Sequence, residues 1–348
     1  MARSRTRRTR DDRTDVVRGL LLVAVGAGVL AGLDNLPSTL GPASWEGFGL
    51  ADLVAGAFPV VVGVAIGWRS RTPELKRLAR RVAVLGGAGL LVGLVVHGLP
   101  MVWTGPLQQL AVASAVVAVV ANRPIGARIG IGLALIAGSA WLLWASPLAG
   151  AGSLRPSLNA AASLDQLVLG VHSLRPSDPW GIATLPVMIV LVLAGNELGR
   201  WLRTRPDGPA TAAALLVLSA WLVVGGLGGT LLVPVNRTLA TPTWATLSLA
   251  FTFGLYGIVH AALHMGARRL LAPVARAGRH GLLVIVALSV VGAVVVGDGS
   301  AGPWRGLRDG LLEPLAGDAW IWVYVGAGAL SALALARALD RRNWRLTA

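Results

Sequence analysis

Long apolar blocks, separated by short polar breaks or by breaks marked with Pro and Gly, run through most of the chain. A helix needs roughly 20 apolar residues to cross about 30 Å of hydrocarbon, and most of the blocks have that length. We therefore expect an all-α fold, a polytopic transmembrane helix bundle of about ten spans. The predicted spans are residues 16–33, 49–68, 82–99, 106–121, 128–145, 180–198, 209–230, 242–263, 281–297 and 319–337.

Composition supports this pattern, because 55% of the 348 residues are hydrophobic and 14% are charged. Soluble domains carry about a quarter charged residues, so a water-soluble fold is disfavoured. The chain divides into a basic cytoplasmic N-terminal segment (1–15), a transmembrane helix bundle (16–338) and a cytoplasmic tail (339–348).

The net charge of +15 is distributed unevenly along the chain. An even number of spans puts both termini and most Lys and Arg residues on one side, which is the positive-inside pattern of membrane proteins. The partner that this charge indicates is the lipid bilayer, and no nucleic acid is expected. We predict an integral protein of the plasma membrane with both termini cytoplasmic.

The absence of cysteine excludes disulfides, thiolate chemistry and zinc sites built on Cys. His260 and His264 have the spacing of a metal-binding pair on a helix, but a third ligand is missing, so no metal is expected. The sequence also has no phosphate-binding P-loop, zincin helix or serine-hydrolase elbow.

Three predicted outer segments, 34–48, 146–179 and 298–318, are longer than neighbouring helices require. Such lengths favour caps, re-entrant pieces or a substrate vestibule. Tryptophans lie near the predicted outer ends and are typical of an aromatic belt at the membrane surface. These are Trp45, Trp103, Trp180, Trp244, Trp304 and Trp320.

Ionisable groups at the edges of spans are costly, so they are the default candidates for function. Asp52 lies near the outer start of the second span, where it would orient a catalytic base or bind a sugar hydroxyl or amine. The alternative is a carboxylate that favours the helix N-terminus. His97 and His172 lie on the outer side and are candidate bases near neutral pH; the alternative for both is a structural role.

Three further polar residues each have a structural and a functional interpretation. Arg18 either pairs with Asp15 at the inner end of the first span or grips a phosphate of a cytoplasmic cofactor. Gln108 and Asn236 either form hydrogen bonds between helices or line a polar cavity.

Short motifs follow one another in a characteristic order along most of the chain. They are Asp15-Val-Val-Arg18-Gly19, Ala43-Ser-Trp45-Glu-Gly47, Ala51-Asp52-Leu-Val, Gly105-Pro-Leu107-Gln108-Gln-Leu110, Leu164-Asp165 through Gly170 and His172, Asp178-Pro179-Trp-Gly181 and Pro234-Val-Asn236-Arg237. This ordered set resembles the heparan-α-glucosaminide N-acetyltransferase family of the transmembrane acyltransferases.

The resemblance implies an enzyme that takes acetyl from cytoplasmic acetyl-CoA and delivers it to an extracytoplasmic amino sugar, glycan or lipid-linked sugar. It implies a catalytic role for Asp52, with His97 or His172 as candidates to replace the family's histidine, and a role in binding acetyl-CoA for Arg18 and Gln108. The residues that it implies for binding the acceptor are Trp45, Asp165, Asp178 and Asn236.

The sequence departs from the family in its catalytic machinery. The family's active-site histidine precedes Ala-Ser-Trp, and Pro42 stands there; Gln109 replaces the arginine after Leu-Gln. Three interpretations therefore stay open: a membrane acyltransferase-like enzyme, a non-catalytic membrane protein of the same fold, or a transporter. The enzyme interpretation predicts a histidine beside Asp52 and a passage from there toward Arg18. The acceptor and the oligomeric state, a homodimer included, stay open.

Overall fold

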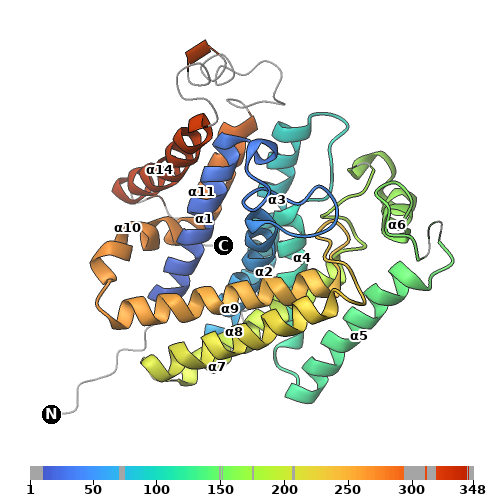
Figure 1. Ribbon diagram of the computed structural model, residues 1–348, viewed down its shortest axis with the longest axis horizontal. Helices are drawn as coiled ribbons and strands as arrows, with labels where there is room; N and C mark the ends of the chain where they lie inside the picture. Colours follow the sequence, from blue (N-terminus) through green and yellow to red (C-terminus); the bar gives the residue numbers. More distant parts are fainter. Residues whose placement is uncertain are drawn as a thin grey trace.

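The computed structural model describes residues 11–69, 75–148, 150, 152–174, 176–205, 208–293, 310–311, 319–342 and 344. Its helices are α1 (Asp12–Ala31), α2 (Leu50–Trp68), α3 (Leu75–His97), α4 (Pro106–Val120), α5 (Ile125–Trp144), α6 (Ala160–Leu169), α7 (Leu185–Thr204), α8 (Pro209–Gly229), α9 (Pro242–His264), α10 (Arg268–Arg279), α11 (Gly281–Val291) and α14 (Trp320–Arg341), with short 3-10 turns at Leu33–Asn35 and Gly170–His172. The prediction of an all-α polytopic bundle is confirmed (Figure 1).

Eight of the described helices are long and apolar enough to cross a bilayer: α1, α2, α3, α5, α7, α8, α9 and α14. The pair α10 and α11, bent by 76°, makes a ninth candidate, and α4 is a shorter apolar helix of 15 residues. Each predicted span thus has a helical counterpart. Two helices lie where loops were expected, because α6 falls within the predicted outer segment 146–179 and α10 within a predicted inner loop. The N-terminal residues 1–10 and most of 298–318 lie outside the described residues.

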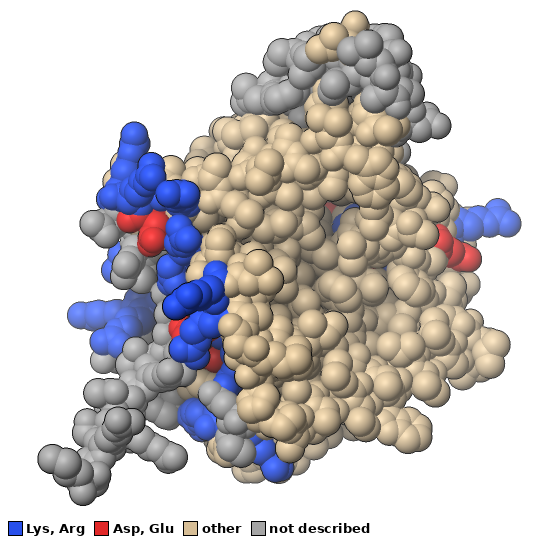
Figure 2. Space-filling view, turned by 60° about the vertical axis from the view of Figure 1, so that its left-hand side comes forward, with Lys and Arg blue, Asp and Glu red and all other residues tan. Residues whose placement is uncertain are grey.

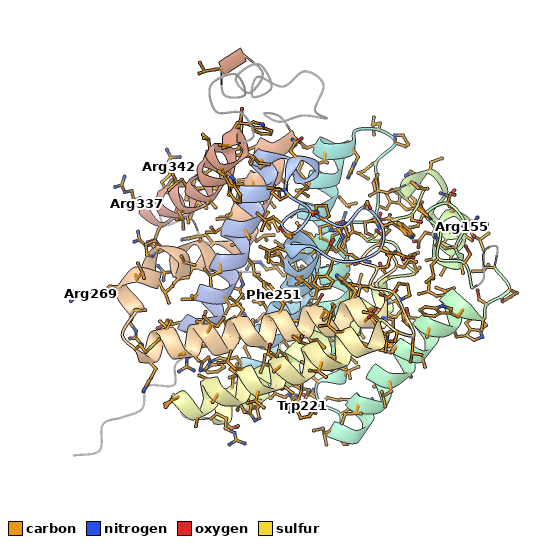
Figure 3. All side chains as sticks on the ribbon, in the orientation of Figure 1. Arg155, Trp221, Phe251, Arg269, Arg337 and Arg342 are labelled. Atoms are coloured by element: carbon orange, nitrogen blue, oxygen red, sulfur yellow. The ribbon has the colours of Figure 1, made fainter. Side chains whose placement is uncertain are left out.

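The bundle has two chemically different ends. The arginine-rich end is the one where α1 begins and where α2 and α7 end; the Asp52 end is the opposite one, where α2, α7 and α9 begin. Figure 3 labels Arg269, Arg337 and Arg342 at one end of the molecule and Arg155 at the other. In Figure 2 the Lys and Arg side chains gather along one edge, and a broad uncharged surface separates them from the far edge.

Many large apolar side chains of the described helices are exposed. On α8, for example, Trp221 is 70% exposed and Val224 is 63% exposed. An apolar surface of this extent is unfavourable in water but matches hydrocarbon. The structure is that of an integral membrane protein.

The centre of the bundle is the pair α2 and α7, which pack closely because glycines lie at their crossing. A Cβ atom added to Gly63 or Gly67 would collide with the backbone of α7, and one added to Gly195 or Gly199 would collide with the backbone of α2. Small residues let helix backbones approach in lipid, where packing rather than the hydrophobic effect drives association. This contact fixes where α2 begins, and so positions Asp52.

One tryptophan does not belong to the predicted aromatic belt. Trp244, in the first turn of α9, is completely buried, and its indole N–H donates to the backbone carbonyl of Asp52. The belt prediction is wrong here because α9 begins against α2 inside the bundle. Trp304 lies outside the described residues.

Candidate functional site

Asp52 is the buried centre of the polar groups at the Asp52 end. It is 2% exposed and occupies the third position of α2, where backbone N–H groups lack partners within the helix. Its Oδ2 atom accepts hydrogen bonds from the N–H of Gly49 at 3.0 Å and of Ala43 at 2.8 Å. The carboxylate therefore caps α2 and holds the preceding loop, in agreement with the structural alternative.

The other oxygen of Asp52 pairs with an arginine from a distant part of the chain. Arg237 Nε lies 3.1 Å from Asp52 Oδ1. Burial lowers the pKa of Arg237 from its ordinary value, while the neighbouring charge of Asp52 raises it. Arginine nevertheless stays charged in proteins, so the pair brings a cation and an anion together in a largely desolvated place.

A compact turn between α8 and α9 fixes the position of Arg237. The side chain of Asn236, itself fully buried, accepts a hydrogen bond from the N–H of Leu239 at 2.8 Å. The hydroxyl of Thr241 accepts from the N–H of Asn236 at 2.9 Å. The carbonyl of Val235 accepts from the N–H of Gly47, which joins this turn to the loop before α2. Asn236 therefore positions Arg237 by shaping the backbone.

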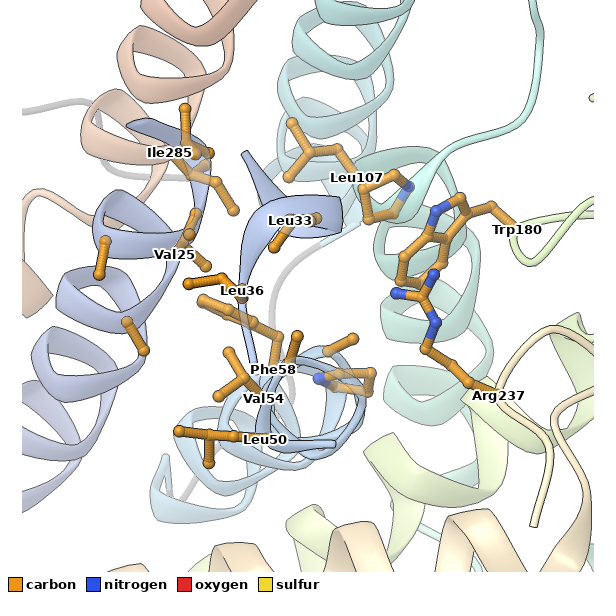
Figure 4. A pocket seen from close by; sticks show the side chains of 18 of the residues that line it. Val25, Leu33, Leu36, Leu50, Val54, Phe58, Leu107, Trp180, Arg237 and Ile285 are labelled. Carbon is orange, nitrogen blue, oxygen red and sulfur yellow. The ribbon is translucent and has the colours of Figure 1, made fainter. Parts of the chain in front are cut away.

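The segment before α7 supplies an aromatic neighbour to Arg237. The guanidinium carbon lies 5.8 Å from the centre of the Trp180 ring, which is within the range of a cation–π contact, and Figure 4 shows the two side chains facing each other. Asp178 fixes this segment, because its Oδ1 atom accepts from the N–H of Trp180 at 2.9 Å and its Oδ2 atom accepts from Thr104 and from the N–H of Leu174.

Asp165, on α6, holds the same segment from the other side. Its Oδ1 atom accepts from the N–H of Ala183 at 3.1 Å, while its buried Oδ2 atom has no hydrogen-bond partner in the described part of the chain. Burial raises the pKa of Asp165 to about 6, and the charge of Asp178 adds to the shift. A Cβ atom on Gly181 would collide with this carboxyl group, which explains why a glycine stands there.

A cavity of about 350 Å³, here called the apolar cavity, begins at Arg237 and Trp180 and extends between α1, α2 and α4. Its wall is mostly aliphatic, with Val25, Leu36 and Val54 among the side chains shown in Figure 4. Polar atoms enter it from Arg237 and Gln109, at the end nearest Asp52.

A second cavity, of about 380 Å³ and here called the arginine-lined cavity, lies toward the arginine-rich end. Four arginines and two aspartates line it, so positive charge is in excess: Arg18, Arg69, Arg81, Arg279, Asp11 and Asp15. Among the described residues, the buried Nε atom of Arg81 has no hydrogen-bond partner. Such a lining is chemically suited to phosphate groups.

The two cavities adjoin each other inside the bundle. Four apolar residues, Phe58, Leu107, Leu110 and Ile285, line both of them. The cavities lie one after the other between the arginines near the start of α1 and the Asp52–Arg237 pair, and these four apolar side chains, here called the apolar constriction, separate them. The passage expected between Asp52 and Arg18 stays a prediction.

The structure does not bring His97 or His172 to Asp52. His97 is exposed at the last position of α3. His172 stacks on Trp103 with ring centres 3.9 Å apart, and its Nδ1 atom lies 2.8 Å from the carbonyl oxygen of Met101. Across the described residues, no hydrogen bond or ion pair joins a histidine to Asp52; the place of the expected base is occupied by Arg237.

The remaining candidate residues lie in three different surroundings. Trp45 donates to the carbonyl of Leu154 and packs under the outer loops, away from the lining of the apolar cavity. Arg18 lines the arginine-lined cavity; its Nη1 atom donates to the carbonyl of Gly278 and lies 3.7 Å from Asp15. Both interpretations of Arg18 are therefore compatible with its position. Gln108 packs against Gly89 of α3, whereas the next residue, Gln109, lines the apolar cavity.

Sequence reasoning missed two residues of this site, Arg237 and Gln109. Both belong to motifs named in the sequence analysis, but the residues chosen there as candidates are their neighbours Asn236 and Gln108. A signal was available for Arg237, because an arginine beside an outer span end opposes the positive-inside rule and calls for a buried acidic partner. A scan against protein-family models gives no match to this chain, and a search of curated proteins gives none either.

Proposed function

We propose that this chain is a membrane acyltransferase-like protein of the plasma membrane, with both termini in the cytoplasm. Acetyl-CoA would bind from the cytoplasm at the arginine-lined cavity. The acyl group would be delivered toward the Asp52–Arg237 pair, to an extracytoplasmic amino sugar or glycan. The observation that supports this proposal best is the junction of the two cavities at Phe58, Leu107, Leu110 and Ile285.

The arginine-lined cavity fits the chemistry of coenzyme A. Its excess of arginine matches an anionic nucleotide, and the unpartnered Nε atom of Arg81 offers a buried donor. The apolar constriction beyond it is compatible with the uncharged, slender arm that carries the acyl thioester. When bound, acetyl-CoA would supply an activated acyl group, while the residues of the chain bind and orient it and limit the entry of water.

A binding and transfer assay tests this proposal. Purified protein in detergent is incubated with radiolabelled acetyl-CoA and a panel of amino sugars. We expect Arg81→Gln to weaken acetyl-CoA binding about tenfold or more, the loss typical of a charge-assisted hydrogen bond. Arg203→Gln, an exposed arginine at the same end that does not line the cavity, is the matched control. Wild-type protein that fails to bind acetyl-CoA would refute the proposal.

The second candidate is a non-catalytic membrane protein of the same fold that binds a ligand. The observation that favours it is the environment of Asp52, which forms an ion pair with an arginine and accepts from two backbone N–H groups rather than orienting a histidine. General acid–base catalysis contributes roughly 10²–10⁴-fold to rates, so its loss would leave a very slow enzyme. Binding of acetyl-CoA without transfer to any amine or hydroxyl acceptor would favour this candidate.

A further inference from the structure

The apolar cavity combines a long aliphatic wall with a few polar groups gathered at one end. A free sugar carries hydroxyl groups on all sides, and those facing this wall would lose their hydrogen bonds to water. An amphiphile meets the opposite conditions, because its chain is stabilised by burial against aliphatic side chains. The separation of polar and apolar groups in the lining therefore favours a ligand with a polar head and an apolar chain.

Arg237 offers donors to the head of such a ligand. Its Nε atom faces Asp52, and in the described part of the protein its two terminal amino groups have no acceptor. The side chain is 25% exposed, so these groups are largely withdrawn from bulk water while they face the cavity. A planar guanidinium with free N–H groups is suited to an oxyanion, above all a phosphate, which it binds with two parallel hydrogen bonds.

Gln109 also lines the cavity, but its amide is turned away from it. Its Nε2 atom donates to the carbonyl of Gly181 and to the hydroxyl of Thr184, both at 2.8 Å. Because a carbonyl only accepts, this contact fixes the orientation of the amide and leaves Oε1 in the other direction. Among the described residues that atom has no hydrogen-bond partner, and it has almost no accessible surface, so it does not open into the cavity. The head of a ligand is therefore recognised by Arg237.

The cavity also has an apolar edge at the surface of the protein. Leu33 and Leu50 line it, and they are 43% and 36% exposed. In Figure 2 the uncharged surface contains a hollow in which charged side chains are visible. We take the exposed leucines as the edge over which an apolar chain enters the cavity.

We propose that the apolar cavity binds a single-chain lipid whose head carries a phosphate. The phosphate accepts from Arg237, and the chain lies along α1 and α2 toward Phe58. This inference goes beyond the proposed function, because the binding does not depend on acetyl-CoA.

Lipid binding is measured on delipidated full-length protein with 1-oleoyl-lysophosphatidic acid, which has one chain, one phosphate and one hydroxyl. The uncharged 1-oleoylglycerol, with the same chain, is the matched probe. We expect the phosphate lipid to bind at least about tenfold more tightly, the difference made by a hydrogen bond to a charged group. Equal affinities for the two probes would overturn the assignment of Arg237.

Two variants test the place of binding. Ala55→Phe adds a ring inside the cavity while keeping Arg237 itself and is expected to weaken binding of the phosphate lipid by at least about tenfold. Val217→Phe adds the same ring on the lipid-facing side of α8 and is expected to change nothing. Thermal unfolding of both variants checks that they are folded. Binding that survives Ala55→Phe in folded protein would overturn the proposed site.

The outcomes separate this inference from the proposed function. Lipid binding in a protein that does not bind acetyl-CoA would leave the lipid site standing and remove the acyltransferase. Acetyl transfer to a soluble amino sugar, with no binding of the phosphate lipid, would keep the acyltransferase and overturn the lipid site.

Discussion

Arg237 Nε lies 3.1 Å from Asp52 Oδ1 and so joins the turn between α8 and α9 to the first turn of α2. Asp52 is nearly inaccessible, and Arg237 is partly so. A charge left alone in such a place costs more than the pair itself contributes, because desolvation is no longer compensated. The pair therefore holds the turn between α8 and α9 against α2, and it also forms the polar end of the apolar cavity.

The coupling between these two charges is measurable. We expect Asp52→Asn and Arg237→Gln each to lower the free energy of unfolding by about 2–4 kcal/mol, because each leaves the other charge without its partner. The double variant should lose clearly less than the sum of the two. Thermal or denaturant unfolding in detergent provides the double-mutant cycle. Strictly additive losses would show that the two side chains do not interact.

The close approach of α2 and α7 requires glycine where the two helices are in contact. Gly63→Val would push a side chain into the backbone of α7, so little folded protein is expected after purification. Gly86→Val on α3 is the control, since open space surrounds that position. The fraction of monodisperse protein in size-exclusion chromatography measures both. Similar yields for the two variants would contradict the packing of α2 against α7.

Asp165 predicts a pH dependence of stability. Its pKa is about 6 in the folded protein, above the ordinary value of 3.8, so the folded state binds the proton more tightly. Stability should therefore fall as pH rises from 3.8 to about 6 and then level off, by about 3 kcal/mol in all. Asp165→Asn keeps an acceptor for Ala183 and stays neutral, so this variant should be more stable than wild type at pH 7.5. The advantage should shrink at pH 4.5, as unfolding curves at the two pH values would show.

The cysteine-free chain allows a direct test of sidedness. Ser157→Cys places a thiol on an exposed outer segment before α6, and Arg123→Cys places one on the exposed turn between α4 and α5. We expect a membrane-impermeant maleimide to label the first in intact cells and the second only after permeabilisation. The reverse pattern would invert the topology and place the arginine-lined cavity outside.

The sequence by itself determined the helices, because an apolar segment long enough to cross a bilayer satisfies its backbone hydrogen bonds by forming a helix. The apolar blocks therefore located the spans within a few residues, and glycine within them indicated close packing. Polar structure near the ends was harder to predict. The helix α6, inside a predicted outer segment, is short and owes its position to contacts with α5 and the segment before α7.

Tertiary structure alone decided which polar side chains meet. Asp52 was a candidate from sequence, but a charge at a span edge has no partner that spacing can reveal. The crossing of α2 with α7 and the turn at Asn236 bring Arg237 to it, while the stacking of His172 on Trp103 holds that histidine elsewhere. The cavities likewise arise between helices that are distant in sequence. Local pattern fixes a helix through its own backbone, whereas a site is fixed by packing between elements, which no single segment encodes.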